Sequence, residues 1–303
     1  MNIIFGPIHS RRFGKSLGVD LSPSRKQCNF DCLYCELDPA KTMGGQEEVL
    51  PVETIVSAVE KGLATHQDID FLTITANGEP TLYPYLSNLI DEINKIKGRT
   101  KTLILSNAAT IDDPKVQDAL LKLDEVKLSL DCATQKCLKK LDRSHSGIDV
   151  ENIKKGMLEF KQKYHGPLII EILFVKTLND SEEEIAKLNE FLLKIRPTRI
   201  DIGTIDRPPA FDVKPLSYEE LLHVSHLFDS SLPVYIASRK KEDISSSAYG
   251  YEEILETLAK RPLTQEDIEV LFDKESQKRV ENLLHKRKIR LVETNGVKFY
   301  KKV

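Results

Sequence analysis

Short β-prone runs alternate six times with segments of helical periodicity over about 230 residues of this 303-residue chain. The runs are mostly apolar, which is typical of parallel strands that are buried on both faces. The six predicted strands are residues 17–21, 71–75, 102–106, 126–130, 168–175 and 200–205. Alternation of this kind favours a βα-repeat fold.

The number of repeats indicates an incomplete barrel. A closed barrel of eight units usually takes about 250 residues, and six units are predicted here. Helices are predicted between the strands, and the one near Ser181 starts with a capping box formed with Glu184. We therefore predict an α/β fold, a partial (βα)6 barrel that spans residues 1–236. In such barrels the functional side chains gather on the loops that follow the strands.

Three cysteines, Cys28, Cys32 and Cys35, lie in the run CNFDCLYC on the loop after the first predicted strand. Three cysteines cannot all pair as disulfides, but their sulfurs can turn toward one centre. Three thiolates on a four-iron cluster leave the fourth iron without a protein ligand, so that it can bind a reactive molecule. The alternative is a zinc site, which needs a fourth nitrogen or sulfur ligand; the closest histidine is His9. The spacing favours the iron–sulfur site over zinc.

The spacing C-x3-C-x2-C, with the aromatic Tyr34 directly before the last cysteine, resembles the signature of the radical SAM superfamily. The runs GPIHSRRFGKSLGVDLSP, NGEPTLYP and DRPP are similar to a branch of iron–sulfur oxidoreductases related to the tRNA wyosine synthases. The resemblance extends over roughly residues 3–210. It implies the same partial barrel that the strand pattern predicts.

The resemblance also implies two cofactors, a [4Fe-4S] cluster and S-adenosylmethionine. The three loop cysteines would hold the cluster, and its open iron would bind S-adenosylmethionine. One electron, from an external flavodoxin- or ferredoxin-like donor, would release methionine and a 5′-deoxyadenosyl radical that abstracts hydrogen from a substrate. The sequence identifies neither that substrate, for which tRNA is one hypothesis, nor a catalytic residue beyond the cofactors.

Three residues of the first two strand-end loops are implied in cofactor binding. Tyr34 would lie against the adenine, although ordinary packing is the alternative. Gly78 and Glu79, in NGEP after the second strand, match a Gly-Gly-Glu motif that meets the methionyl ammonium, with Asn77 in place of the first glycine. Glycine permits a close backbone approach, and carbonyl and carboxylate oxygens suit a cationic amine. Standing alone, NGEP would be interpreted as a turn.

Three more polar residues end the third and fourth predicted strands. Asn107 lies in SNAAT, and Ser129 and Asp131 lie in LSLD. From this face such side chains would bond the ribose hydroxyls and the methionyl carboxylate. Capping of strand ends and loops is an equally supported interpretation for each of them.

Four basic residues, Arg11, Arg12, Lys15 and Arg207, flank the first and last predicted strands. They are candidates for binding a phosphate or carboxylate of the substrate, and solvated surface charge is the alternative.

Two further cysteines, Cys132 and Cys137, raise the question of a second cluster. Two cysteines are too few for another four-iron cluster, and the wyosine synthases use three additional ones. We predict two free, partly buried thiols.

The last part of the chain has a different character. Residues 237–250 are charged, rich in serine and poor in apolar residues, which predicts a linker. Residues 251–303 predict three helices and a hairpin at Asn295-Gly296, an order that resembles a winged helix-turn-helix. Binding of RNA or DNA and contact with a protein are equally supported for it. Six basic residues gather on and after its third predicted helix, namely Lys278, Arg279, Lys286, Arg287, Lys288 and Arg290.

Composition restricts the setting. The chain is 40% hydrophobic and 30% charged, as in a globular protein, and its net charge of −3 argues against a general nucleic-acid binder. No run approaches the roughly 18 apolar residues that span a membrane, and the N-terminus predicts no secretion signal. Clustered cysteines suit a reducing compartment, so a cytoplasmic location without a membrane partner is predicted.

A regulator is the rival hypothesis to the radical enzyme. It would be an iron–sulfur sensor whose winged helix binds nucleic acid according to the state of the cluster. This hypothesis leaves NGEP, LSLD and the six-unit barrel without a purpose, because a sensor needs no pocket for a cofactor.

Overall fold

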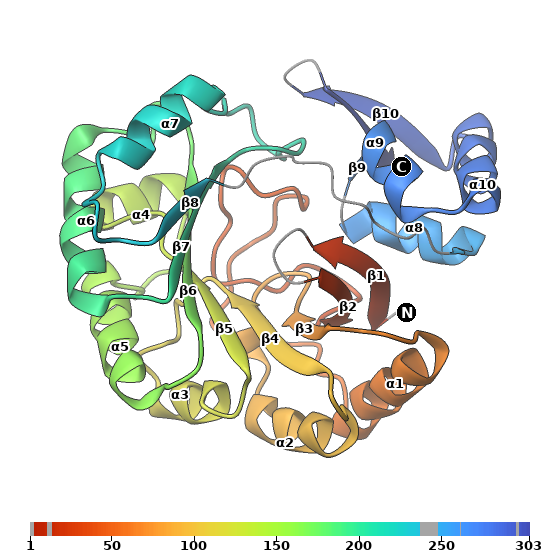
Figure 1. The fold of residues 1–303 in the computed structure, drawn as a ribbon, viewed down its shortest axis with the longest axis horizontal. Coiled ribbons are helices and arrows are strands. Elements are labelled where there is room, and N and C mark those ends of the chain that lie inside the picture. Colours follow the sequence, from red (N-terminus) through yellow and green to blue (C-terminus); the bar gives the residue numbers. More distant parts are fainter. Residues whose placement is uncertain (1–2, 11–13, 237–247, 261, 295–296) are drawn as a thin grey trace.

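The computed structural model describes residues 3–10, 14–236, 248–260, 262–294 and 297–303. An eight-stranded sheet runs in the order β1 to β8 and curves into a barrel that stays open between its first and last described strands (Figure 1). β1 is antiparallel to β2, and each later pair of neighbours is parallel. The strands are β1 (Ile4–Ser10), β2 (Gly14–Asp20), β3 (Phe71–Thr75), β4 (Lys101–Ser106), β5 (Glu125–Ser129), β6 (Leu168–Phe174), β7 (Arg199–Thr204) and β8 (Val234–Ile236).

Helices between the strands cover the outer face of the sheet (Figure 1). They are α1 (Val52–Thr65), the short η1 (Pro80–Leu82), α2 (Leu86–Ile96), α3 (Pro114–Leu120), α4 (Gln135–Leu141), α5 (Val150–Lys163), α6 (Glu182–Ile195) and α7 (Tyr218–His226). Strand residues that point outward, such as Leu72, Val126 and Ile170, are fully buried against these helices. Burial of this apolar face is the main stabilisation of the barrel.

The inner face of the barrel mixes polar with apolar residues. Alternation along a strand puts Lys127 of β5, Glu171 of β6 and Asp201 of β7 on the side opposite the outer apolar residues. Lys127 Nζ lies 2.5 Å from Glu171 Oε1 and 3.5 Å from Asp201 Oδ2. A lumen with buried ion pairs differs from a barrel filled by branched apolar side chains.

The six predicted strands are confirmed as β2 to β7, and the partial barrel with them. The predicted order lacked β1, β8 and α4. β1 contains Gly6 and Pro7, which are turn-forming residues, and β8 has three residues. The helix α4, with seven residues, is shorter than most amphipathic patterns.

A second, smaller sheet forms near the C-terminus, with the antiparallel order β10-β11-β9. Three helices and the two hairpin strands occur as predicted, and β9 is added. Residues 237–247 of the predicted linker and the turn Asn295-Gly296 lie outside the described residues, so the linker, the domain boundaries and the winged-helix assignment stay predictions. The elements are α8 (Tyr251–Lys260), β9 (Leu263–Thr264), α9 (Gln265–Leu271), α10 (Lys274–His285), β10 (Ile289–Thr294) and β11 (Val297–Lys302).

This C-terminal unit has its own hydrophobic cluster, with Ile254, Leu258 and Phe272 at its centre. Two hydrogen bonds are among its contacts with the barrel. The Tyr249 hydroxyl donates a hydrogen bond to the carbonyl of Pro7, and Lys301 Nζ lies 3.3 Å from the carbonyl oxygen of Glu36. In the described part of the chain no helix combines the length and the apolar character that a membrane span requires.

Candidate active site

The cysteine loop, residues 21–51, connects β2 to α1 and contains neither a named helix nor a named strand. Its three cysteines are unpaired and half-buried. Backbone hydrogen bonds hold the loop against the end of α4, because the amide of Asp31 donates to the carbonyl of Asp142 at 3.0 Å and that of Leu33 to Leu141 at 2.9 Å. The amide of Cys35 donates to the carbonyl of Cys32 at 3.1 Å, which tightens the last turn. These bonds fix the thiols on the carboxyl side of the sheet.

Burial raises the pKa of each of these thiols. The pKa of Cys28 rises to about 12, and those of Cys32 and Cys35 rise as well, although the Lys26 ammonium opposes the rise at Cys35. The thiols therefore carry protons at neutral pH until a metal replaces them. Buried thiols that metal binding deprotonates are the usual ligands of iron–sulfur clusters.

The spacing of the sulfurs distinguishes a cluster from a single ion. A tetrahedral zinc site has Zn–S bonds of about 2.3 Å, so its sulfurs lie roughly 4 Å apart. In the described residues, the group whose ligand atoms all lie within 4.8 Å of one another is Cys132, Cys137 and Glu184; the three loop cysteines do not form such a group. At least one pair of loop sulfurs is therefore farther apart than in a tetrahedral zinc site, which leaves room for a larger inorganic centre.

Gly78 brings the loop after β3 against the cysteine loop. The amide of Gln27 donates to the carbonyl of Asn77 at 2.8 Å, and the amide of Glu79 donates to the carbonyl of Gln27 at 3.0 Å. Gly78 has φ of +136°, and a Cβ there would lie 2.0 Å from the carbonyl oxygen of Gln27. Only glycine fits this contact, so the close approach expected from NGEP is present and its partner is the residue before Cys28.

The Glu79 carboxylate is buried and hydrogen-bonded through both of its oxygens. Its Oε1 accepts hydrogen bonds from the amide of Thr81 at 2.9 Å, the Thr81 hydroxyl at 2.6 Å and the Ser106 hydroxyl at 2.8 Å. Its Oε2 accepts from the amide of Asn107 at 2.7 Å. Oε1 is thus saturated, whereas Oε2 has room for one further donor. Glu79 fixes the end of β4, and its contact with an ammonium group stays a prediction.

Asn107 reaches the cysteine loop from the end of β4. Its Nδ2 lies 2.7 Å from Asn29 Oδ1 and 3.7 Å from the sulfur of Cys28. Its Oδ1 accepts from the amide of Ala109 at 3.0 Å. Asn29 was absent from the predicted site, although it stands directly after Cys28 in the sequence.

Tyr34 and Asp131 are directly connected. The Tyr34 hydroxyl donates to the Asp131 carboxylate, whose other oxygen accepts from the amide of Leu173 at 2.7 Å. Burial raises the pKa of Asp131 to about 7, and the nearby Glu171 carboxylate adds to the rise. Asp131 therefore ties the aromatic residue of the cysteine loop to both β5 and β6.

A narrow crevice of about 10 Å³ collects four of the predicted site residues beside the cysteine loop. Asp142 also borders the crevice, and its Oδ1 is buried with no hydrogen-bond partner in the described structure. Burial holds the pKa of Asp142 well above its usual range, and the nearby Asp131 carboxylate adds to the rise. A buried polar atom without a partner suits a small polar guest, and a crevice of this volume holds about one water molecule. The four predicted residues are Tyr34, Asn107, Ser129 and Asp131.

The prediction that Cys132 and Cys137 are free thiols is wrong, because the two form a disulfide. Cys132 follows β5, and Cys137 lies in the first turn of α4, so their Cα atoms come within 5.5 Å. Such a separation suits a disulfide. Both are buried, and neither belongs to the cysteine loop.

The basic candidates are dispersed. Arg207 pairs with Glu36 at 3.6 Å, and the Arg207 side chain is 23% exposed. Because Glu36 directly follows Cys35, this ion pair stabilises the cysteine loop. Lys15 is the second residue of β2, at the opposite end of the barrel from the cysteine loop. Its Nζ donates a hydrogen bond to the carbonyl of Gln67 at 2.9 Å. Arg11 and Arg12 lie outside the described residues.

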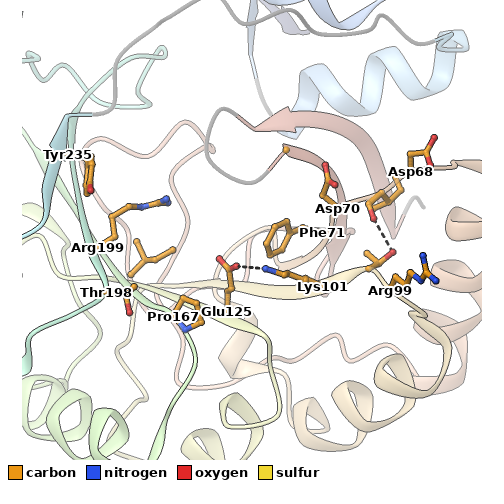
Figure 2. Close-up of a pocket in the computed structure, with 14 residues that line it drawn as sticks. Asp68, Asp70, Phe71, Arg99, Lys101, Glu125, Pro167, Thr198, Arg199 and Tyr235 are labelled. Atoms are coloured by element: carbon orange, nitrogen blue, oxygen red, sulfur yellow. Dashed lines mark hydrogen bonds and ion pairs between the residues drawn. The ribbon is translucent and has the colours of Figure 1, made fainter.

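A second hollow, of about 940 Å³, opens at the amino ends of the strands and holds none of the predicted site residues. Figure 2 shows Lys101 and Glu125 facing each other in it, 3.4 Å apart, with Phe71 close to Lys101. The buried side chains of Phe71, Leu103 and Ile169 form a separate apolar cluster at this end of the barrel. Charges of both signs are paired here, and the hollow lies on the opposite side from the cysteine loop.

Comparison with known proteins agrees with this geometry. The family model described as the radical SAM superfamily matches residues 24–188. A UPF0026 protein of Helicobacter pylori is 44% identical over 302 residues, which cover 98% of this chain and 97% of that protein. A UPF0026 protein of Methanocaldococcus jannaschii is 29% identical over 100% of this chain and 96% of its own length.

Among solved structures, a radical SAM methyltransferase from Sphaerobacter thermophilus superposes with a TM-score of 0.55. It is 14% identical in sequence and covers 74% of this chain and 67% of its own. At this identity the likeness concerns the fold alone, and it agrees with the partial barrel.

Proposed function

Because this chain belongs to the radical SAM superfamily, and is an enzyme of that family, we propose that Cys28, Cys32 and Cys35 hold a [4Fe-4S] cluster at which S-adenosylmethionine is cleaved reductively. When bound, the cluster supplies an electron to S-adenosylmethionine, which yields a 5′-deoxyadenosyl radical for hydrogen abstraction. The electron would come from an external flavodoxin- or ferredoxin-like donor.

The observation that carries the proposal is the contact between the cysteine loop and the loops after β3 and β4. Gln27 pairs with Gly78 through backbone hydrogen bonds, and Asn107 bonds Asn29. Three unpaired thiols therefore lie beside the strand ends at which (βα) barrels place their chemistry. The donor set and the unpartnered oxygen of Asp142 both suit a buried inorganic centre with a polar ligand.

The side chains around the crevice would bind and orient S-adenosylmethionine. Tyr34 is held by Asp131, so its ring has a fixed position for stacking against the adenine. Ser129 and Asn107 present hydrogen-bonding groups to a ribose or a carboxylate. Glu79 accepts a hydrogen bond from the amide of Asn107 through Oε2, and that oxygen can accept a further hydrogen bond from the ammonium group.

Formation of 5′-deoxyadenosine tests the proposal. The protein is reconstituted anaerobically with iron and sulfide, reduced with dithionite and given S-adenosylmethionine. We expect 5′-deoxyadenosine from the unaltered protein and from Cys137→Ser, which removes a cysteine outside the loop. Cys32→Ala should reduce the product to background. An intact cluster without product from the unaltered protein would contradict the proposal and favour the iron–sulfur sensor.

We further propose that the substrate is an RNA, with tRNA as the first candidate, which the C-terminal unit would present to the barrel. The support is a group of exposed cations on and after α10, together with the sequence similarity to the wyosine synthase branch. Arg279 does not belong to the group, because it bonds the carbonyl of Tyr249 at 2.6 Å and pairs with Glu275. The exposed cations are Lys278, Lys286, Arg287, Lys288 and Arg290.

Binding of the full chain to bulk tRNA at several salt concentrations tests this second proposal. Each phosphate contact should steepen the fall of affinity with salt by about 0.7–0.9 on a logarithmic scale. Lys286→Glu with Lys288→Glu should weaken binding, whereas Lys187→Glu with Lys194→Glu, on α6, should not. An affinity for tRNA that does not change with salt concentration would count against RNA as the ligand. An affinity that falls equally in both double variants would do the same.

A further inference from the structure

We propose that the buried charge of Lys26 tunes the reduction potential of the cluster, and that Asp31 and Arg143 hold the lysine in position. This inference rests on the proposed function, because it requires a cluster on the three loop cysteines. The inference concerns the positive charge that Lys26 keeps beside the thiolates. Asp31 and Arg143 are the positioning residues that hold this charge.

The first support is a buried ion pair inside the cysteine loop. Lys26 Nζ lies 2.9 Å from Asp31 Oδ1, and the two side chains are 8% and 5% exposed. Lys26 stands two residues before Cys28, and Asp31 stands directly before Cys32. Burial of two charges costs desolvation that their attraction often fails to recover, so such a pair is weak support for a purely stabilising role. Its place among the thiols points to an electrostatic one.

The second support is the contact between the lysine and the sulfur ligands. The buried Lys26 ammonium lies close enough to Cys35 and Cys28 to interact electrostatically with both thiols, and its partner Asp31 directly precedes Cys32. Hydrogen bonds to cluster sulfurs and net charge near a cluster are two of the means by which a protein sets the cluster's potential. A low-dielectric surrounding strengthens both effects.

The third support is the way in which Asp31 is fixed. Asp31 Oδ1 also accepts a hydrogen bond from the amide of Ala40 at 3.2 Å, and Oδ2 lies 3.5 Å from Arg143 Nη2. The guanidinium of Arg143 in turn stacks on the ring of Phe211, 4.8 Å from its centroid. One carboxylate thus faces two cations, and the three groups together carry one net positive charge. The buried Lys26 ammonium carries part of this positive charge inside the cysteine loop.

The sign of the effect follows from the charges. Reduction adds one electron to the cluster, taken from the external donor or from dithionite in the test. A nearby positive charge stabilises the more negative, reduced state and raises the reduction potential. Removal of the lysine charge should therefore lower the potential and make the cluster harder to reduce.

A redox titration without S-adenosylmethionine tests the inference. Lys26→Met, Lys26→Gln, Lys26→Arg and the unaltered protein are reconstituted, analysed for iron, and titrated with dithionite and mediators while the signal of the reduced cluster is followed by electron paramagnetic resonance. Lys26→Met and Lys26→Gln should titrate at a more negative potential, and Lys26→Arg should stay close to the unaltered protein. Lys41→Met, which removes an exposed lysine from the same loop, is the matched control and should not shift.

Two outcomes would overturn the inference. One is a potential in Lys26→Met or Lys26→Gln that equals that of Lys41→Met. The other is loss of iron from both neutral variants while circular dichroism is unchanged and Lys26→Arg keeps its cluster, because the lysine would then assemble the site without tuning it. A shifted potential together with a failure of the unaltered protein to form 5′-deoxyadenosine would leave this inference standing and overturn the proposed function.

Discussion

The chain places two groups of cysteines at the carboxyl end of the same sheet, and their states are opposite. Cys28, Cys32 and Cys35 stay unpaired, whereas Cys132 and Cys137 form a disulfide. Spacing alone does not explain the difference, because both groups have neighbours three to five positions apart. The local backbone decides the outcome: one group lies on an irregular loop and the other at the start of a helix.

The helix brings the pair together. Thr134 is the N-cap of α4, and its hydroxyl accepts from the amide of Cys137 at 3.2 Å, which turns Cys137 toward the end of β5. On the cysteine loop the backbone is held by other segments, through Asp31 to Asp142 and Leu33 to Leu141. On this backbone the three thiols remain unpaired.

The largest difference between the two groups should appear in bound iron. Cys28→Ser should lose essentially all of the cluster, because a cubane needs all three of its protein thiolates when the fourth iron binds none. Cys132→Ser with Cys137→Ser should keep about four irons per chain. Iron and acid-labile sulfide are measured after anaerobic reconstitution. Equal losses of iron in the two variants would show that the two groups of cysteines do not differ in cluster binding.

The next largest effect should come from Gly78, where the loop after β3 contacts the cysteine loop. Gly78→Ala places a Cβ 2.0 Å from the carbonyl oxygen of Gln27 at a φ of +136°, and should cost about 4 kcal/mol in the free energy of unfolding. Gly98→Ala is the control, since Gly98 also has positive φ but nothing lies within 4 Å of its Cβ position. That variant should cost about 1 kcal/mol. Urea unfolding measures both, and equal costs would show that backbone strain alone matters.

The pH dependence of stability should reveal Asp131, which stands between the two cysteine groups. Its pKa is raised from 3.8 to about 7 by burial, so the folded state holds the proton more tightly than the unfolded chain. The corresponding stability is complete below pH 3.8 and is lost as the pH rises to about 7.

The variant Asp131→Asn has no ionisable group at this position and should lack this loss, which amounts to roughly 2.3 kcal/mol between pH 5 and pH 7. Urea unfolding of both metal-free proteins at a series of pH values provides the measurement. The stability of the unaltered protein should fall relative to the variant as the pH rises. Parallel curves would mean that Asp131 titrates near its ordinary value.

The smallest effect should come from the disulfide. Opening the short loop between Cys132 and Cys137 should cost about 2 kcal/mol in the free energy of unfolding, from the chain entropy that the bond removes. Dithiothreitol and the double serine variant should lower stability by the same amount, and dithiothreitol should have no effect on that variant. A further loss in the reduced variant would point to another oxidised group.

The sequence predicted the framework of the fold better than its contacts. The strands β2 to β7 were recognisable because parallel strands covered on both faces are continuous apolar runs, such as Phe71 to Thr75. The cysteine loop was recognisable from the spacing of its three cysteines. β1 and β8 were not, because the first carries turn-forming residues and the second has too few residues for a pattern.

Contacts between distant segments left no local pattern. Asn29 and Asn107 bond each other across 78 positions, and Gln27 meets Gly78 across a similar distance in the chain. Lys26 and Asp31 were absent from the predicted site, and the structure shows that both are buried. The disulfide was missed because spacing does not reveal how a helix turn orients Cys137.

The hydrogen bond between Lys301 and Glu36 has a consequence for the timing of biosynthesis. The two residues are 265 positions apart, so the loop is translated long before the lysine that contacts it. At typical elongation rates the interval is on the order of 10–50 s. During that time the thiols emerge from the ribosome without this contact. A cluster inserted before Lys301 is made would enter a less protected site, so the order of translation and metal loading can affect the yield of active protein.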